Sequence, residues 1–258
     1  MSASTNLFIW YELMTSDATA AEAFYRSVIG WKTADAGMPD MKYTLLSVAE
    51  SAIAGLMNLP AEASAAGARP GWLGSIAVDD VDARLAQLLQ AGGAMHHPAR
   101  DIPGVGRFAT VADPPGAVFC LFKGDSSEPP PQPASGTPGT MGWHELYAGD
   151  LDSAWAFYSA LFGWTKDETI DMGQMCLPVV CRRRRQPGHR GHDDPPARGA
   201  AAWLAVLRQC RGHRRCCRTH QRRRRQVVSG PMEVPGGSYI VQCLDPQGAM
   251  FAMVALKR

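Results

Sequence analysis

Four residues between Cys210 and Arg225 have the types and the spacing of zinc ligands. They are Cys210, His213, Cys216 and His220, in the stretch CRGHRRCCRTHQRRRR. Structural zinc sites are held by four such thiolate and imidazole groups in a tetrahedron. The four arginines that end the stretch could contact nucleic-acid phosphates, although no aromatic residue lies among them for base stacking. Taken alone, the stretch suggests a metal site with a basic arm.

The composition of the surrounding segment weakens that hypothesis. Residues 176–225 hold fifteen arginines, no lysine and two aspartates, with five of the seven cysteines and four of the seven histidines. Outside the segment 11 basic and 22 acidic residues remain, although the whole chain has a formal net charge of +2. The excess of basic over acidic residues in the whole chain and the zinc-like spacing therefore both come from one segment. The rest is typical of an acidic cytoplasmic protein with reduced cysteines.

A second pattern that could carry chemistry pairs a tryptophan with a glutamate. Strand alternation places Trp10 and Glu12 on one face, and Trp143 and Glu145 on the equivalent face of a second strand. An indole beside a carboxylate can hold a flat or cationic ligand, and such a glutamate can act as an acid or base. The alternative is that each tryptophan is core and each glutamate bonds to the backbone. His144 is either a structural residue or a ligand contact.

The two pairs lie in two copies of one sequence pattern. MTSDATAAEAFYRSVIGWKT in the first half matches YAGDLDSAWAFYSALFGWTK in the second at an offset of 133. PGVGRFATVADPPGAVFCLF matches PGGSYIVQCLDPQGAMFAMV at an offset of 132. Between the copies lies a Pro/Gly/Ser linker that we expect to be too polar to pack. The predicted domains are 1–124 and 141–258, joined by the linker 125–140.

Periodicity and turn residues predict the elements of the first copy. A strand over 7–15 precedes a helix that Asp17 caps and Gly30 ends. Strands at 43–49, 51–59 and 71–78 follow, then a helix within 79–93 and strands at 107–113 and 117–122. His96 and His97 fall in a loop or strand edge, where we expect exposed side chains. The order indicates two βαβββ modules in each copy.

These motifs resemble the vicinal oxygen chelate superfamily of glyoxalases, bleomycin-resistance proteins and extradiol dioxygenases. The similarity rests on the D…FY…GW helix, the AVDDVD strand-to-helix junction and the closing DPPG and DPQG turns. It covers all of the first copy and both ends of the second. The resemblance implies an α+β fold of paired βαβββ modules that form cup-shaped mixed sheets, in two tandem glyoxalase-like domains.

Residues 176–225 depart from that pattern, although the repeat offset shows that their length is right. Trp203 falls close to the expected copy of Trp72. A shift of one nucleotide, with synonymous codons of our choice, turns the segment into a strand and a helix ending in glycines. We therefore interpret it as an out-of-frame, non-native read, with a zinc site and a basic arm as competing interpretations. If the segment is translated as written, we expect the second copy to lack core strands, because clustered charges cannot be buried unpaired.

The resemblance also implies where a metal would bind. Metal-using members place His or Glu at set strand positions, and here those positions hold Trp10, Leu73, Cys120, Trp143 and Ala252. Indole, isobutyl and methyl groups cannot bind a divalent ion, and a lone thiol does not replace three ligands. We expect no metal cofactor. A register shifted by one residue would instead bring His144 and Tyr11 to the ligand position.

The expected function follows from the family. The resemblance implies a protein that binds a small organic molecule in a metal-free cup, where a lyase or isomerase reaction is one expectation. Non-catalytic sequestration or resistance is the alternative, and a metal-dependent glyoxalase or dioxygenase is a third. We expect a small-molecule ligand, no nucleic acid and no membrane, since no apolar run is long enough to span one. Monomer and homodimer both stay open.

Overall fold

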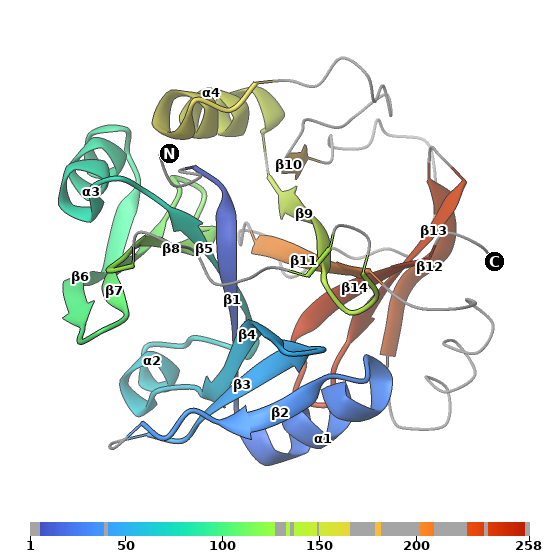
Figure 1. Cartoon of the computed structure of the whole chain (residues 1–258). Helices are drawn as coiled ribbons and strands as arrows, with labels where there is room; N and C mark the ends of the chain where they lie inside the picture. The colour runs from blue at the N-terminus through green and yellow to red at the C-terminus, as the bar shows by residue number, and fades with distance from the viewer. Residues whose placement is uncertain are drawn as a thin grey trace. The chain divides into compact units, whose positions relative to one another are not determined.

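The structure is a computed structural model (Figure 1). It describes residues 6–38, 41–126, 133–134, 137–148, 150–165, 179–181, 202–208, 226–234 and 237–255. The zinc-like set from Cys210 to His220 lies outside the described residues. No helix among the described residues is long and apolar enough to cross a membrane.

The first copy of the repeat contains eight strands and three helices. In chain order they are β1 (Phe8–Thr15), α1 (Ala18–Val28), β2 (Lys32–Asp35), β3 (Tyr43–Val48), β4 (Ser51–Asn58), α2 (Ala61–Ala65), β5 (Gly71–Ala77), α3 (Val81–Gln90), β6 (Ala94–Ile102), β7 (Gly106–Ala112) and β8 (Val118–Gly124). The predicted strands and helices are all present. The prediction missed β2 and α2, and it left β6 as a loop or strand edge.

The described part of the second copy repeats this order. Its elements are β9 (Met141–Tyr147), α4 (Leu151–Phe162), β10 (Val179–Cys181), β11 (Ala202–Arg208), β12 (Gln226–Val234), β13 (Ser238–Leu244) and β14 (Met250–Ala255). The expectation that residues 176–225 contain no strand is wrong for β10 and β11. Their sequences, VVC and AWLAVLR, consist mostly of apolar residues, which is typical of strands.

Aspartates start the three longer helices in the way that the sequence predicts. The Asp17 carboxylate accepts a hydrogen bond from the Ala20 N–H at 2.9 Å, which satisfies one donor of the first turn of α1. Asp80 caps α3 and Asp150 caps α4 through equivalent bonds. Gly163 ends α4 with a φ of 67°, a left-handed conformation that glycine adopts without a steric penalty.

The chain forms two compact units, and each unit draws on both copies of the repeat. Unit 1 comprises Met1–Ile9, Leu73–Pro129 and His144–Trp203, and unit 2 comprises Trp10–Trp72, Pro130–Trp143 and Leu204–Arg258. The predicted boundaries, 1–124 and 141–258, describe the repeat in the sequence. The compact units instead join the first module of one copy to the second module of the other.

Unit 2 contains the neighbouring strands β2-β3-β4-β1 and the neighbouring strands β11-β14-β13-β12. β1 runs parallel to β4, with Glu12 opposite Gly55. α1 contributes Phe24 and Tyr25, whose rings lie 5.8 and 5.5 Å from that of Phe251 in β14. The first module of the first copy therefore shares its core with the last module of the second.

Unit 1 has the strand order β5-β8-β7-β6, with β5 parallel to β8 and the other neighbours antiparallel. α3 lies along these strands (Figure 1). Its apolar core combines residues of the second module with residues of β9 and α4: Ile76, Val78, Val81, Leu88, Ala109, Val111, Ala117, Phe119, Leu121, Leu146, Ala154, Phe157, Tyr158, Leu161, Phe162 and Trp164. This shared burial is what holds α4 to the second module.

The end of the linker is packed, which corrects the expectation that it is too polar to do so. The Trp31 indole N–H donates to the carbonyl oxygen of Gly139 at 2.8 Å, and this bond is buried. Trp164, which is the repeat equivalent of Trp31, donates to the carbonyl oxygen of Asn6 at 2.7 Å. Each tryptophan thus holds the segment that leads into the first strand of the other copy.

Candidate ligand-binding site

β1 separates its side chains onto two faces, as its alternating sequence predicts. Tyr11, Leu13 and Thr15 are buried, while Trp10 and Glu12 between them keep partial exposure. The burial of the first set and the exposure of the second place Trp10 and Glu12 on the same, more open face. The prediction that these two side chains share a face is therefore confirmed.

A chain of two hydrogen bonds links Trp10 to Glu12 through Tyr43 of β3. The Trp10 Nε1–H donates to the Tyr43 hydroxyl oxygen at 3.0 Å, and the Tyr43 hydroxyl donates to Glu12 Oε1 at 2.9 Å. Because the indole only donates and the carboxylate accepts, the direction of both bonds is fixed. Glu12 therefore accepts a hydrogen bond from a side chain, whereas the alternative interpretation gave it a bond to the backbone.

Gly55 makes room for this network. It lies opposite Glu12 on β4, and a Cβ atom added there would overlap the Tyr43 hydroxyl and ring. The Tyr43 ring therefore lies directly over the backbone of β4, at a place where any other residue would displace it. Sequence reasoning missed both residues, because the contact depends on the register between β3 and β4.

The equivalent glutamate of the second copy lies in a different environment. Glu145 in β9 is only 5% exposed, and Val180 of β10 is its neighbour in the parallel register. Trp143 is placed in β9 by its backbone. The two glutamates that the sequence treats as equivalent therefore differ: Glu12 is partly exposed and Glu145 is buried.

His144 lies between Trp143 and Glu145 and faces an aromatic neighbour. Its ring stacks on Phe8, with centroids 4.0 Å apart and planes inclined by 20°. Burial lowers the pKa of His144 from 6.5 to about 3, so the ring is neutral at physiological pH. A neutral ring stacked on a phenyl group fits the structural interpretation of this residue.

Comparison with known proteins decides the family. A sequence model of the glyoxalase/bleomycin resistance protein/dioxygenase superfamily matches residues 8–121. The putative glyoxylase CFP32 of Mycobacterium tuberculosis is 30% identical over 263 residues, covering 95% of this chain and 93% of the relative. The chain belongs to the glyoxalase/bleomycin resistance protein/dioxygenase superfamily. Anthracycline biosynthesis protein DnrV of Streptomyces peucetius is 28% identical, covering 96% of this chain and 92% of that protein.

Solved structures of the superfamily have the same fold. The Mn(II)-bound glyoxalase from Novosphingobium aromaticivorans superposes with a TM-score of 0.64 at 15% identity, covering all of this chain and 84% of that chain. An extradiol ring-cleaving dioxygenase from B. fuscum gives a TM-score of 0.64 at 15% identity, with 100% and 74% coverage. At such identities the similarity shows a common fold, and any chemistry has to be argued from the residues of the site.

The residues at the metal-ligand positions of the superfamily do not fit a divalent ion. Trp10 uses its only ring N–H to donate to Tyr43, Leu73 and Ala252 carry no donor atom, and Cys120 is a buried thiol. The Cys120 sulfur lies 3.6 Å from the Thr110 hydroxyl. Within the described ranges no three His, Cys, Asp or Glu side chains form a group that could hold a metal ion. A superfamily reaction that depends on a metal therefore has no ligand set among these residues.

Proposed function

We propose that the chain binds a small organic molecule without a metal ion, at the sheet face that carries Trp10, Glu12 and Tyr43. The hydrogen-bonded chain from Trp10 through Tyr43 to Glu12 carries this proposal. An indole offers a flat apolar surface, while a carboxylate accepts hydrogen bonds from a ligand hydroxyl or amine. Superfamily membership supports a small-molecule ligand, and the residues at the metal positions support a metal-free site.

The same three residues also suit proton transfer. Tyr43 holds its proton toward Glu12, so a ligand proton taken up by Glu12 could be exchanged through the Tyr43 hydroxyl. A lyase or isomerase would use Glu12 in this way, since both reactions move a proton on the substrate. Sequestration without turnover uses the same contacts for binding alone, and it is the second candidate function.

The test is a ligand screen by thermal shift, because a ligand that binds the native state raises its melting temperature. An anthracycline belongs in the screen, because the names of two relatives refer to anthracycline biosynthesis. We expect a hit whose affinity is unchanged by a chelator. A stoichiometric divalent ion in the purified protein, or loss of binding on chelation, would overturn the metal-free proposal.

Variants of the network then separate binding from catalysis. Glu12→Gln keeps an oxygen that can accept from Tyr43 but removes the titratable group, and Glu62→Gln in α2 is the exposed control. A binding protein keeps its affinity in Glu12→Gln to within about threefold, whereas an acid–base enzyme loses about a hundredfold or more in kcat. Tyr43→Phe breaks both hydrogen bonds and should weaken binding in either case. Equal binding by the wild type and Tyr43→Phe would show that the ligand binds elsewhere.

A further inference from the structure

In unit 1 a buried tyrosine of α4 lies beside a buried carboxylate. Tyr158 is 1% exposed, and its hydroxyl donates to Oδ2 of Asp113 at 3.0 Å. Asp113 follows β7 and is 2% exposed. Its Oδ1 accepts the backbone N–H groups of Gly116 at 2.8 Å and Ala117 at 2.6 Å. The hydroxyl proton of Tyr158 is therefore held toward one oxygen of a carboxylate from which solvent is nearly excluded.

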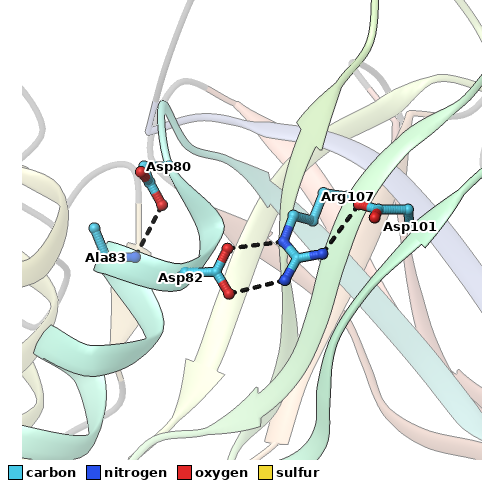
Figure 2. A network of polar contacts seen from close by, with 5 residues as sticks. All are labelled: Asp80, Asp82, Ala83, Asp101 and Arg107. Carbon is cyan, nitrogen blue, oxygen red and sulfur yellow. Dashed lines mark hydrogen bonds and ion pairs between the residues drawn. The ribbon is translucent and has the colours of Figure 1, made fainter.

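The surroundings of its charge distinguish Asp113 from other aspartates of unit 1. The exposed carboxylates of Asp82 and Asp101 both form ion pairs with Arg107 (Figure 2). Within the part of the chain that the structure describes, no lysine, arginine or histidine forms such a pair with Asp113. Burial raises the pKa of Asp113 above its ordinary value, because the charged form is poorly solvated there. Asp113 is thus a better proton acceptor than an exposed aspartate.

An indole ring lies against the ring of Tyr158. Trp164 stacks on it, with centroids 5.6 Å apart and planes inclined by 10°. Trp164 is 8% exposed, so it is the closer of the two rings to solvent. Its Nε1–H donates to the carbonyl oxygen of Asn6 at 2.7 Å, which fixes the orientation of the indole. Because stacked aromatic rings in contact exchange an electron readily, Trp164 can connect Tyr158 with an electron acceptor in solution.

We propose that Tyr158 is a redox-active tyrosine, which passes an electron through Trp164 to a one-electron oxidant and its hydroxyl proton to Asp113. The oxidant belongs to the class of radicals and metal complexes that accept one electron. The O–H bond of Tyr158 breaks and an O–H bond forms on Oδ2 of Asp113, while the oxidant is reduced by one electron. The products are a neutral tyrosyl radical and a neutral carboxylic acid, so the uncompensated buried charge disappears.

Unit 2 contains the equivalent arrangement with a longer hydrogen bond. The Tyr25 hydroxyl lies 3.3 Å from Oδ2 of Asp245, and Trp31 stacks on Tyr25 with centroids 5.5 Å apart. A proton passes less easily along a longer hydrogen bond, so we assign the redox activity to Tyr158 and not to Tyr25. A one-electron reductant such as ascorbate restores the resting state, because the proton then returns to the tyrosine oxygen. This activity goes beyond the proposed function, since it requires no bound ligand.

The experiment oxidises the full-length protein with photochemically generated tris(bipyridine)ruthenium(III) and records electron paramagnetic resonance spectra of frozen samples. The wild type is compared with Tyr158→Phe, Asp113→Asn and Tyr239→Phe. Tyr239 is the matched control, because it also donates to a carboxylate, that of Glu233 at 2.8 Å, but in an exposed bond. We expect a tyrosyl spectrum in the wild type and in Tyr239→Phe, and its loss in Tyr158→Phe. In Asp113→Asn, which cannot take up the proton, the radical should form about a hundredfold more slowly.

Other outcomes would overturn the proposal. A tyrosyl spectrum retained in Tyr158→Phe would exclude this tyrosine, and loss of the spectrum in Tyr25→Phe instead would place the radical in unit 2. An unchanged rate in Asp113→Asn would show that this carboxylate does not accept the proton. If Tyr158→Phe or Asp113→Asn fails to fold, the wild type still decides. Ring-deuterated tyrosine must narrow its spectrum, and a dissolved paramagnetic complex must leave the spectrum unbroadened. Failure of the first would assign the radical to tryptophan, and failure of the second to an exposed tyrosine.

Discussion

The hydroxyl group of Tyr25 donates a hydrogen bond to Oδ2 of Asp245 at 3.3 Å, although 220 positions separate the two residues in the chain. The equivalent bond in unit 1 joins the Tyr158 hydroxyl to Oδ2 of Asp113 at 3.0 Å. Each tyrosine comes from the FY pair of one copy, and each aspartate from the closing DP turn of the other. Oδ1 of each aspartate accepts backbone N–H groups of its own turn, so one buried carboxylate joins the turn to a helix.

Removing either tyrosine hydroxyl should destabilise the protein. Tyr25→Phe removes the donor to Oδ2 of Asp245 and the acceptor of the Trp72 indole N–H, and Tyr158→Phe removes the donor to Oδ2 of Asp113. Because these groups are buried, we expect each change to lower the free energy of unfolding by about 1 to 3 kcal/mol in urea titrations. Tyr239→Phe, which removes an exposed bond to Glu233, is the control and should cost less than about 0.5 kcal/mol. Equal costs for Tyr25→Phe and Tyr239→Phe would contradict this account.

The first copy alone should associate with itself. In a fragment of residues 1–124, α1 lacks the strands of the second copy that cover Phe24 and Tyr25. The DP turn of the same fragment contains Asp113, which receives the equivalent tyrosine in unit 1. Two fragments could therefore supply each other with the missing partner, and we expect a dimer by light scattering. A monomeric fragment that unfolds cooperatively would refute the shared core.

A side chain at position 55 should disrupt the candidate site. In Gly55→Ala the new methyl group overlaps the Tyr43 ring, so the Tyr43 hydroxyl must leave Trp10 and Glu12. Overpacking of this kind costs about 1 to 3 kcal/mol. Gly71→Ala is the control, since its Cβ would meet only one backbone oxygen at 3.8 Å. In the Gly55→Ala background Tyr43→Ala should cost less than in the wild type, and additive costs would show that the residues do not interact.

Acid should weaken the native state through His144. Its folded pKa of about 3 lies below the unfolded value of 6.5, so between these values the unfolded chain binds a proton that the native chain does not. Stability therefore falls as the pH decreases from 6.5, by at most about 1.4 kcal/mol per pH unit, and by less because the ring keeps partial exposure. The change in unfolding free energy with pH should be smaller in His144→Gln than in the wild type. It should be unchanged in His96→Gln, because His96 is exposed. The same slope in both variants would assign it to other groups.

An intact mass of the purified protein tests the interpretation of residues 176–225. A frame-corrected segment would lose most of its fifteen arginines, so the mass would differ from that of the printed sequence. A mass that matches the printed sequence would contradict a sequencing error.

The position of β11 bears on the same question. Val206 of β11 lies opposite Ala252, and Ser75 of the first copy lies opposite Cys120 in the equivalent way. The strand thus holds the expected place with the residues as written.

The local parts of the fold could be predicted, because their signals lie within a few residues. The helix caps Asp17, Asp80 and Asp150 can be identified from the sequence alone. The alternation of residue types in β1 likewise predicts which side chains lie on which face of the strand. The pairing of modules between copies could not be predicted, since Tyr25 and Tyr158 have the same neighbours in sequence. Tyr43 was missed for a related reason, because its contacts depend on the register between β3 and β4, which no short pattern specifies.

The interleaving of the two copies affects how the protein must be made. A ribosome that adds roughly 5 to 20 residues per second needs on the order of 10 to 40 seconds to proceed from Tyr25 to Asp245. During that interval the apolar face of α1 has emerged, while the strands that cover it have not been synthesised. The nascent chain therefore cannot complete its first module before its last. Until β14 has been synthesised, the side of α1 that carries Phe24 and Tyr25 lacks its partner Phe251, so the order of the modules leaves apolar surface uncovered for most of synthesis.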